Sequence, residues 1–162
     1  MLKTSTILLA LMLSLQVPSA AAAQNGAALA SRIADTIKEY EAGWKLKSSA
    51  TYPHTETLRK EPLYFHWTRH GTQYVFAFVY LHTTEEDAAR TLQHTCSDER
   101  RRGEVSPSDV KWTGGETYEW KGTGIYENAH GYYFRKGKVV VTINSSSKST
   151  AERFATLIAE QL

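Results

Sequence analysis

The sequence predicts a single α+β domain with two layers, in which an antiparallel sheet carries its helices on one face. One observation is that a segment with helical periodicity precedes two units of the same plan, each a hairpin followed by an amphipathic helix. The other is composition: with 41% hydrophobic and 11% aromatic residues in 162, the chain has enough apolar side chains for one packed core and is unlike a disordered segment.

The N-terminus has the pattern of an export signal. Lys3 is followed by a mainly apolar stretch over residues 7–17, and then by a run of alanines that ends at Ala23. This order is typical of a secretory signal peptide cleaved after Ala23. The apolar stretch is shorter than the ~20 residues that a membrane-spanning helix needs. We therefore predict a signal peptide over residues 1–23 and an exported domain over residues 24–162, periplasmic or secreted, with no membrane anchor after cleavage.

The first helix and the segment after it are predicted from spacing and from glycine and proline. The apolar positions of this helix recur at helical spacing and are Leu29, Ile33, Ile37 and Tyr40. Gly43 ends the helix. Trp44 then begins an extended segment that we predict as an edge strand, and residues 51–61 are predicted as a loop because they contain Pro53.

The first hairpin is predicted from residues 63–68 and 73–81. A two-residue turn at His70 and Gly71 would place Trp67 opposite Tyr74 and would sort the large aromatic side chains onto one face. In this register the core face holds Leu63, Phe65, Trp67, Tyr74, Phe76 and Phe78, and the other face holds Tyr64, His66, Thr68, Val75, Ala77 and Val79.

A second helix is expected directly after this hairpin. Thr83 with Glu86, and equally Thr84 with Asp87, have the spacing of a capping box. The predicted buried stripe of this helix is Ala88, Leu92 and Cys96. We expect the helix to end near Ser97 and residues 98–107, which mix arginines with acidic residues, to form a charged loop.

The second unit repeats the plan. Residues 116–120 are a predicted short strand, and residues 132–135 and 138–143 a second hairpin around Lys136 and Gly137. This turn would place Phe134 opposite Val139 and Tyr132 opposite Val141, with Tyr133 and Val140 on the other side of the sheet. Ser149 and Glu152 have capping-box spacing, and the stripe of the last helix is predicted as Ala151, Phe154, Ala155, Ile158 and Leu162.

The candidate site is the sheet face that the helices are expected to leave open. Tyr64, His66, Tyr133 and Arg135 lie there beside aliphatic side chains, and a contiguous exposed patch of this mixed kind is typical of an interface or a groove. The alternative is that the N-terminal helix or residues 99–130 fold over this face.

Catalytic, metal and cofactor motifs are not evident in the sequence. It contains neither a G-x-S-x-G elbow nor an H-E-x-x-H pair, and the six histidines are not spaced as ligands of one metal ion. Cys96 lies on a predicted buried stripe, where a free cysteine packs as a small hydrophobe. We therefore assign no catalytic residue, no metal and no cofactor.

Three functions fit these observations, and the first is favoured. It is an exported binding or interaction domain without enzymatic activity, which takes an unknown small molecule or protein on the open face. The second is a secreted or periplasmic hydrolase with His66 as general base in a cleft roofed by residues 99–130, and the third is a homodimer joined through the same face. The balance of 19 basic and 17 acidic residues argues against a nucleic-acid partner.

The C-terminal segment has a resemblance to known proteins. It reads GYYFRKGKVVVTINSSSKSTAERFATLIAEQL, a hairpin followed by a closing helix, and it resembles the endings of small exported bacterial α+β domains of uncharacterised or sensor-like type. The resemblance implies a bacterial periplasmic or secreted setting and no catalytic residues.

Overall fold

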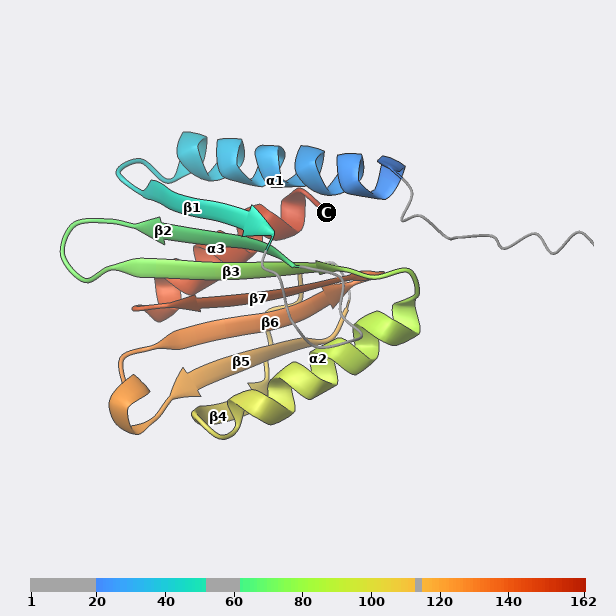
Figure 1. Ribbon diagram of the computed structural model, residues 1–162. Coiled ribbons are helices and arrows are strands. Elements are labelled where there is room, and N and C mark those ends of the chain that lie inside the picture. The colour runs from blue at the N-terminus through green and yellow to red at the C-terminus, as the bar shows by residue number, and fades with distance from the viewer. Residues whose placement is uncertain (1–19, 52–61, 113–114) are drawn as a thin grey trace, which may run out of the picture.

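The computed structural model describes residues 20–51, 62–112 and 115–162 (Figure 1). Its elements, in chain order, are α1 (Ala20–Tyr40), β1 (Lys45–Thr51), β2 (Leu63–Thr68), β3 (Tyr74–Leu81), α2 (Glu85–Glu99), β4 (Gly103–Pro107), β5 (Thr117–Gly122), the 3-10 helix η1 (Gly124–Tyr126), β6 (His130–Lys136), β7 (Val139–Ser145) and α3 (Lys148–Glu160). The predicted signal peptide lies mostly outside the described residues, and α1 begins before the predicted cleavage point after Ala23.

One antiparallel sheet of seven strands organises the molecule, in the order β1-β2-β3-β7-β6-β5-β4. The chain runs through β1, β2 and β3, crosses over by α2 to the far edge, and returns through β4 to β7, so that β7 pairs with β3 at the centre. This confirms the α+β class, the antiparallel sheet, the edge position of the strand after Trp44, and the two units of hairpin plus helix.

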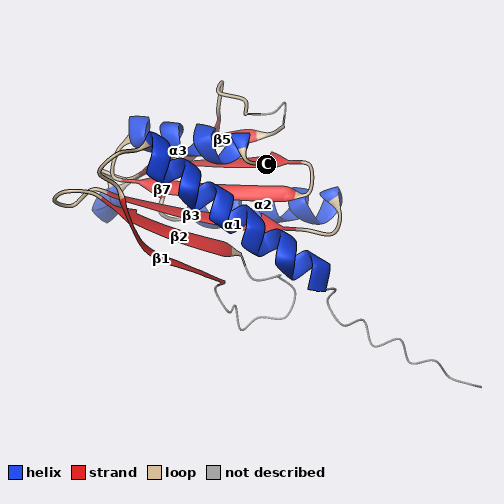
Figure 2. Cartoon of the chain, turned by 90° about the horizontal axis from the view of Figure 1, so that it is seen from above, coloured by secondary structure: helices blue, strands red, loops and turns tan. Residues whose placement is uncertain are grey.

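The main core lies between the sheet and the helices α1 and α3. The helices bury Leu29, Ile33, Ile37, Ala151, Phe154, Ala155 and Ile158, and the sheet buries Leu63, Phe65, Trp67, Val75, Ala77, Val79, Tyr132, Phe134, Val141 and Ile143 against them. Figure 2 shows α1 running obliquely across the strands. The predicted stripes of both helices are therefore confirmed, except that Tyr40 is 66% exposed and Leu162 is partly buried at the edge of this core.

Helix α2 lies on the opposite face, and the prediction that all helices share one face is wrong. Its stripe of Ala88, Leu92 and Cys96 is buried as predicted, but it packs on Trp120, Tyr133 and Val140. Figure 1 shows α2 in front of the strands and α3 behind them. Helix α2 crosses from β3 to β4 over β7 and β6. Because α1 and α3 cover one face of the sheet, α2 buries the second apolar face of those strands.

The register of the first hairpin differs from the prediction by one residue. Trp67 pairs with Val75, not with Tyr74, and Phe65 pairs with Ala77. The turn is longer than two residues, because the Arg69 N–H donates to the Gln73 carbonyl (3.1 Å), and Gly71 adopts the left-handed φ of 75° that such a loop requires. A shift of one residue exchanges the two faces of a strand. Val75, Ala77 and Val79 are therefore in the main core, and Tyr74, Phe76 and Phe78 lie on the other face.

The register of the second hairpin differs by two residues, which leaves the faces as predicted. Phe134 pairs with Val141 and Tyr132 with Ile143, and the turn begins at Gly137, whose φ is 55°. Because side chains alternate with a period of two, this shift keeps Tyr132 and Phe134 on the core face and Tyr133 on the other.

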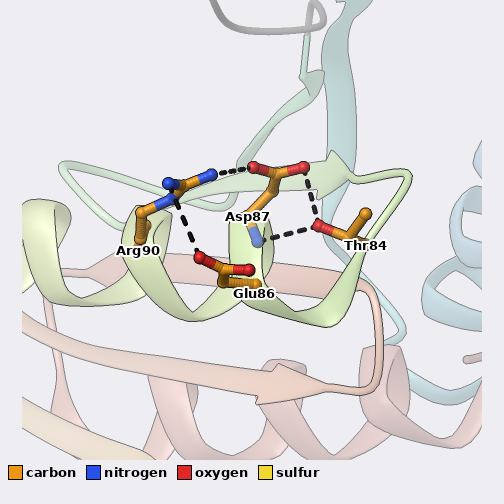
Figure 3. A network of polar contacts seen from close by, with 4 residues as sticks. All are labelled: Thr84, Glu86, Asp87 and Arg90. Atoms are coloured by element: carbon orange, nitrogen blue, oxygen red, sulfur yellow. Dashed lines mark hydrogen bonds and ion pairs between the residues drawn. The ribbon is translucent and has the colours of Figure 1, made fainter.

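The N-terminal cap of α2 agrees with the prediction. At α2, the cap is the second of the two predicted pairs: Thr84 Oγ1 accepts a hydrogen bond from the Asp87 N–H (3.1 Å) and donates one to the Asp87 carboxylate (2.7 Å), which Arg90 also contacts (Figure 3). These hydrogen bonds from Thr84 and Arg90 lower the pKa of Asp87.

The helices and strands also extend beyond their expected ends. Helix α2 continues to Glu99, and the expected charged loop contains the strand β4. Ser147 rather than Ser149 caps α3, accepting from the Thr150 N–H. The predicted loop over residues 51–61 lies almost wholly outside the described residues.

Candidate functional site

An aromatic surface covers β2 and β3 on the face that α2 shares. It consists of Tyr64 and His66 on β2 and of Tyr74, Phe76, Phe78 and Tyr80 on β3. All six side chains are only half-buried, whereas their neighbours on the core face are almost fully buried. These six partly exposed rings form a contiguous aromatic patch on one face of the sheet. A patch of this kind typically marks an interaction site.

The rings of this surface pack against each other across the strands. The ring centroids of His66 and Phe76 are 4.4 Å apart at an interplanar angle of 29°, which is a stacked pair. Those of Tyr64 and Phe78 are 4.9 Å apart at 40°, which is a tilted pair. Each of these rings therefore contacts the ring on the neighbouring strand, in the offset geometry that aromatic pairs prefer.

A groove runs between this aromatic surface and the C-terminal end of α2. It encloses about 460 Å³ and is lined by Tyr64, Tyr74, Phe76, Phe78, Glu99, Arg102, Trp120, Tyr126, Ala129 and Asn144. One wall is aromatic and comes from β2 and β3, and the other is built by the end of α2, β5 and the segment around η1. The volume lies within the range of roughly 300–1,000 Å³ that small-molecule sites occupy.

A glycine of the sheet lies between the two walls of the groove. Phe76 is paired with Asn144, Asn144 with Gly131, and Gly131 with Trp120, so a residue without a side chain lies between the two walls. A Cβ at Gly131 would collide with the side chain of Asn144. Gly131 therefore leaves the space that the Asn144 side chain occupies.

A hydrogen bond from Tyr133 holds the side chain of Asn144 in place. The Tyr133 hydroxyl donates to Asn144 Oδ1 at 3.0 Å, and the tyrosine itself is fully buried under α2, which raises its pKa far above the ordinary value. This hydrogen bond orients the side-chain amide of Asn144, which lines the groove.

The polar rim of the groove is an ion pair at the end of α2. Arg102 Nη1 lies 3.5 Å from Glu99 Oε1, with the Glu99 side chain 17% and the Arg102 side chain 60% exposed. Burial raises the pKa of Glu99, an effect that Arg102 partly offsets. The indole N–H of Trp120 donates to the Glu99 backbone carbonyl (3.2 Å) and ties this end of the helix to β5.

The structure brings together two of the four residues predicted for the site. Tyr64 lines the groove, and His66 lies beside it on the same face, stacked on Phe76, where burial and Lys47 lower its pKa. Tyr133 lies beneath α2 and reaches the groove only through Asn144. Arg135 lies near the start of α2, where its guanidinium contacts the Gly137 carbonyl (3.2 Å) and Glu85 (3.5 Å).

Most of the groove was not predicted. Phe76, Phe78 and Tyr74 were assigned to the core because of the register error, and Glu99 and Arg102 to a solvated loop. The sequence feature that could have indicated the groove is the alternation of aromatic and small residues along β3. This alternation shows that the strand has two distinct faces, but it does not show which face the helices cover. Val75, Ala77 and Val79, predicted on the open face, are buried in the main core, and Val140 is buried under α2.

A second, smaller cavity lies on the opposite side of the sheet. It encloses about 340 Å³ between α1 and β1 and is lined by Ala34, Asp35, Ile37, Lys38, Trp44, Lys45, Leu46 and Trp67. Within residues 20–51, 62–112 and 115–162, no group of three His, Cys, Asp or Glu side chains is arranged to hold a metal ion. None of the helices in these ranges is long and apolar enough to cross a membrane.

Comparison with known proteins gives a fold relationship. No protein-family model and no curated protein matches the chain. Its structure is similar to that of a GTP binding regulator from Thermotoga maritima, with a TM-score of 0.50 and 10% sequence identity over 82% of this chain and 85% of the other. At this identity the likeness shows the fold alone, an α+β arrangement common to both chains.

Proposed function

We propose that this chain is a binding domain that acts outside the cytoplasm without catalysing a reaction, and that its ligand occupies the groove between β3 and the end of α2. The observation that carries the proposal is the groove itself, in which half-exposed aromatic rings face a wall with one ion pair. The signal-peptide pattern before Ala23 supports the export.

The aromatic wall provides the free energy that such binding needs. Covering apolar surface contributes about 25 cal/mol per Å², so a ligand that covers about 100 Å² of the wall would gain about 2.5 kcal/mol before the cost of association. The Asn144 amide and Arg102 add fixed polar contacts that orient the ligand. This combination of an apolar lining with a few polar groups is typical of ligand sites.

The geometry supports binding better than hydrolysis. The lowered pKa of His66 keeps its imidazole neutral near pH 7, as a general base requires. Its ring, however, is stacked on Phe76, and the carboxylate that lines the groove, Glu99, is paired with Arg102 rather than with an imidazole. A base of the Ser-His-Asp type is oriented by a carboxylate at its other nitrogen.

A ligand screen with a groove variant tests the proposal. The full chain is screened by thermal shift against amino acids, sugars, nucleotides, fatty acids and cell-wall fragments, and each hit is measured by calorimetry. Phe76→Ala removes the central ring of the wall and should weaken binding of the hit at least tenfold. Tyr40→Ala, which removes a 66% exposed ring from α1, should leave binding unchanged. Equal affinities for wild type and Phe76→Ala would show that the ligand binds elsewhere.

A further inference from the structure

The polar groups of the groove favour an anion over a cation. Arg102 offers a guanidinium with several N–H donors, of which Glu99 engages Nη1. Its backbone is fixed, because the Arg102 carbonyl accepts from the Thr123 N–H (3.0 Å). Arg102 therefore presents the more accessible charge of the lining, since its side chain is 60% exposed and that of Glu99 is 17% exposed.

The lining of the groove holds one positive and one negative side chain, Arg102 and Glu99. Arg100 follows Glu99 at the end of α2, and Lys47 lies beyond the aromatic wall beside His66. Asp98 is paired with His94 (3.0 Å) on its own helix, which leaves Glu99 as the carboxylate in the lining.

The ring geometry disfavours a cationic ligand. A cation binds over the face of an aromatic ring, within about 6 Å of its centroid. Here one face of Phe76 is stacked on His66, and Phe78 packs at a tilt against Tyr64. These contacts leave fewer ring faces for a cation, whereas the apolar surface of the wall suits an aliphatic group.

We propose that the groove binds a small amphiphile with an aliphatic chain and a carboxylate head, of which a medium-chain fatty acid is the simplest example. The chain lies along Phe76 and Phe78, and the carboxylate accepts hydrogen bonds from Arg102. The volume of about 460 Å³, near the lower end of the range for ligand sites, sets the limit to a chain of medium length. This inference rests on the proposed function and adds the chemical class of the ligand.

Three ligands, each with a linear chain of ten carbon atoms, test which charge of the head group the groove prefers. Decanoate, decanol and decyltrimethylammonium are titrated into the full chain below their aggregation concentrations, with calorimetry as the readout. Decanoate should bind at least tenfold more tightly than the ammonium compound. In the series from hexanoate to decanoate, each added methylene should tighten binding about three- to fourfold, as burial of one methylene implies.

A matched pair of arginine variants tests the role of Arg102. Arg102→Gln should weaken decanoate binding at least tenfold and leave decanol binding unchanged, because only the carboxylate needs the guanidinium. Arg90→Gln is the control, since the Arg90 side chain on α2 is 67% exposed and forms ion pairs with Glu86 and Asp87, as Arg102 does with Glu99. It should bind decanoate as the wild type does.

The outcomes separate this inference from the proposed function. If decyltrimethylammonium binds as well as decanoate, or if Arg102→Gln and Arg90→Gln are alike, the carboxylate assignment is wrong. A second outcome is that decanoate fails to bind while a ligand of another class binds to wild type and not to Phe76→Ala. In that case only the proposed class of ligand is wrong. If no ligand of any class depends on Phe76, the groove is not the site and both proposals fail.

Discussion

Replacing Phe154 with alanine is expected to lower the free energy of unfolding by about 3–5 kcal/mol, the usual cost of emptying a buried phenylalanine site. Phe154 is fully buried on α3. Its ring contacts Trp44 and Trp67 edge-on, with centroids 5.2 and 5.3 Å away. Trp44 directly precedes β1 and Trp67 lies on β2, so the ring joins α3 to the edge of the sheet. Large neighbours of this kind cannot collapse fully into the space that alanine leaves.

Urea unfolding of Phe154→Ala beside wild type measures this cost. Tyr40→Ala serves as the control, because Tyr40 is 66% exposed and its removal should change the stability by less than about 0.5 kcal/mol. A loss below about 1 kcal/mol for Phe154→Ala would contradict the placement of α3 against the β1–β2 edge.

Replacing Leu92 with alanine is expected to cost about 2–5 kcal/mol. Leu92 is fully buried in the cluster that joins α2 to Trp120, Tyr133 and Val140. The variant therefore tests the finding that α2 covers the face opposite α1 and α3. Gln93→Ala, at an exposed position of the same helix, should be close to neutral.

The reactivity of Cys96 reports locally on the contact between α2 and the sheet. It lies one turn after Leu92 and is 4% exposed, and burial raises the pKa of its thiol to about 11. Only about one thiol in a thousand is then ionised at pH 8, and the thiolate is the reactive form. We expect slow labelling by a disulfide reagent in wild type and Gln93→Ala, and faster labelling in Leu92→Ala. Labelling of native wild type at the rate of a free thiol would show that α2 does not bury Cys96.

The helices and their buried sides could be predicted because a helical stripe is a property of local spacing. Leu29, Ile33 and Ile37 recur every four residues, as do Ala88, Leu92 and Cys96, and both stripes are buried as predicted. Spacing says which side of a helix is buried but not which face of the sheet receives it. That choice depends on the crossover from β3 to β4, which no local pattern contains.

The first hairpin shows why the register could not be predicted. Both faces of β3 are apolar, one with Val75 and its small neighbours and the other with Phe76 and its aromatic neighbours, so hydrophobicity does not distinguish them. The prediction paired large residues with large ones. In the structure the large Phe65 and Trp67 of β2 pair with the small Ala77 and Val75 of β3, which leaves room for the helices above.

The groove depends on strand order as well as on register. Tyr64 could be predicted at the site because its position on β2 gives it the same face in either register. Asn144 and Trp120 face the aromatic wall only because β7, β6 and β5 follow β3 in the sheet. These residues are 24 positions apart in the chain, and no sequence motif brings them together.

The most direct test of the groove as the binding site is an NMR titration of the four indole N–H signals. Trp120 lines the groove, whereas Trp44, Trp67 and Trp112 belong to the core on the other side of the sheet. With decanoate, or with the tightest hit of the screen, we expect the indole signal of Trp120 and the side-chain amide signals of Asn144 to shift, while the other three indole signals stay in place. Shifts of Trp44 and Trp67 with an unchanged Trp120 would contradict the account and would place the ligand in the cavity under α1.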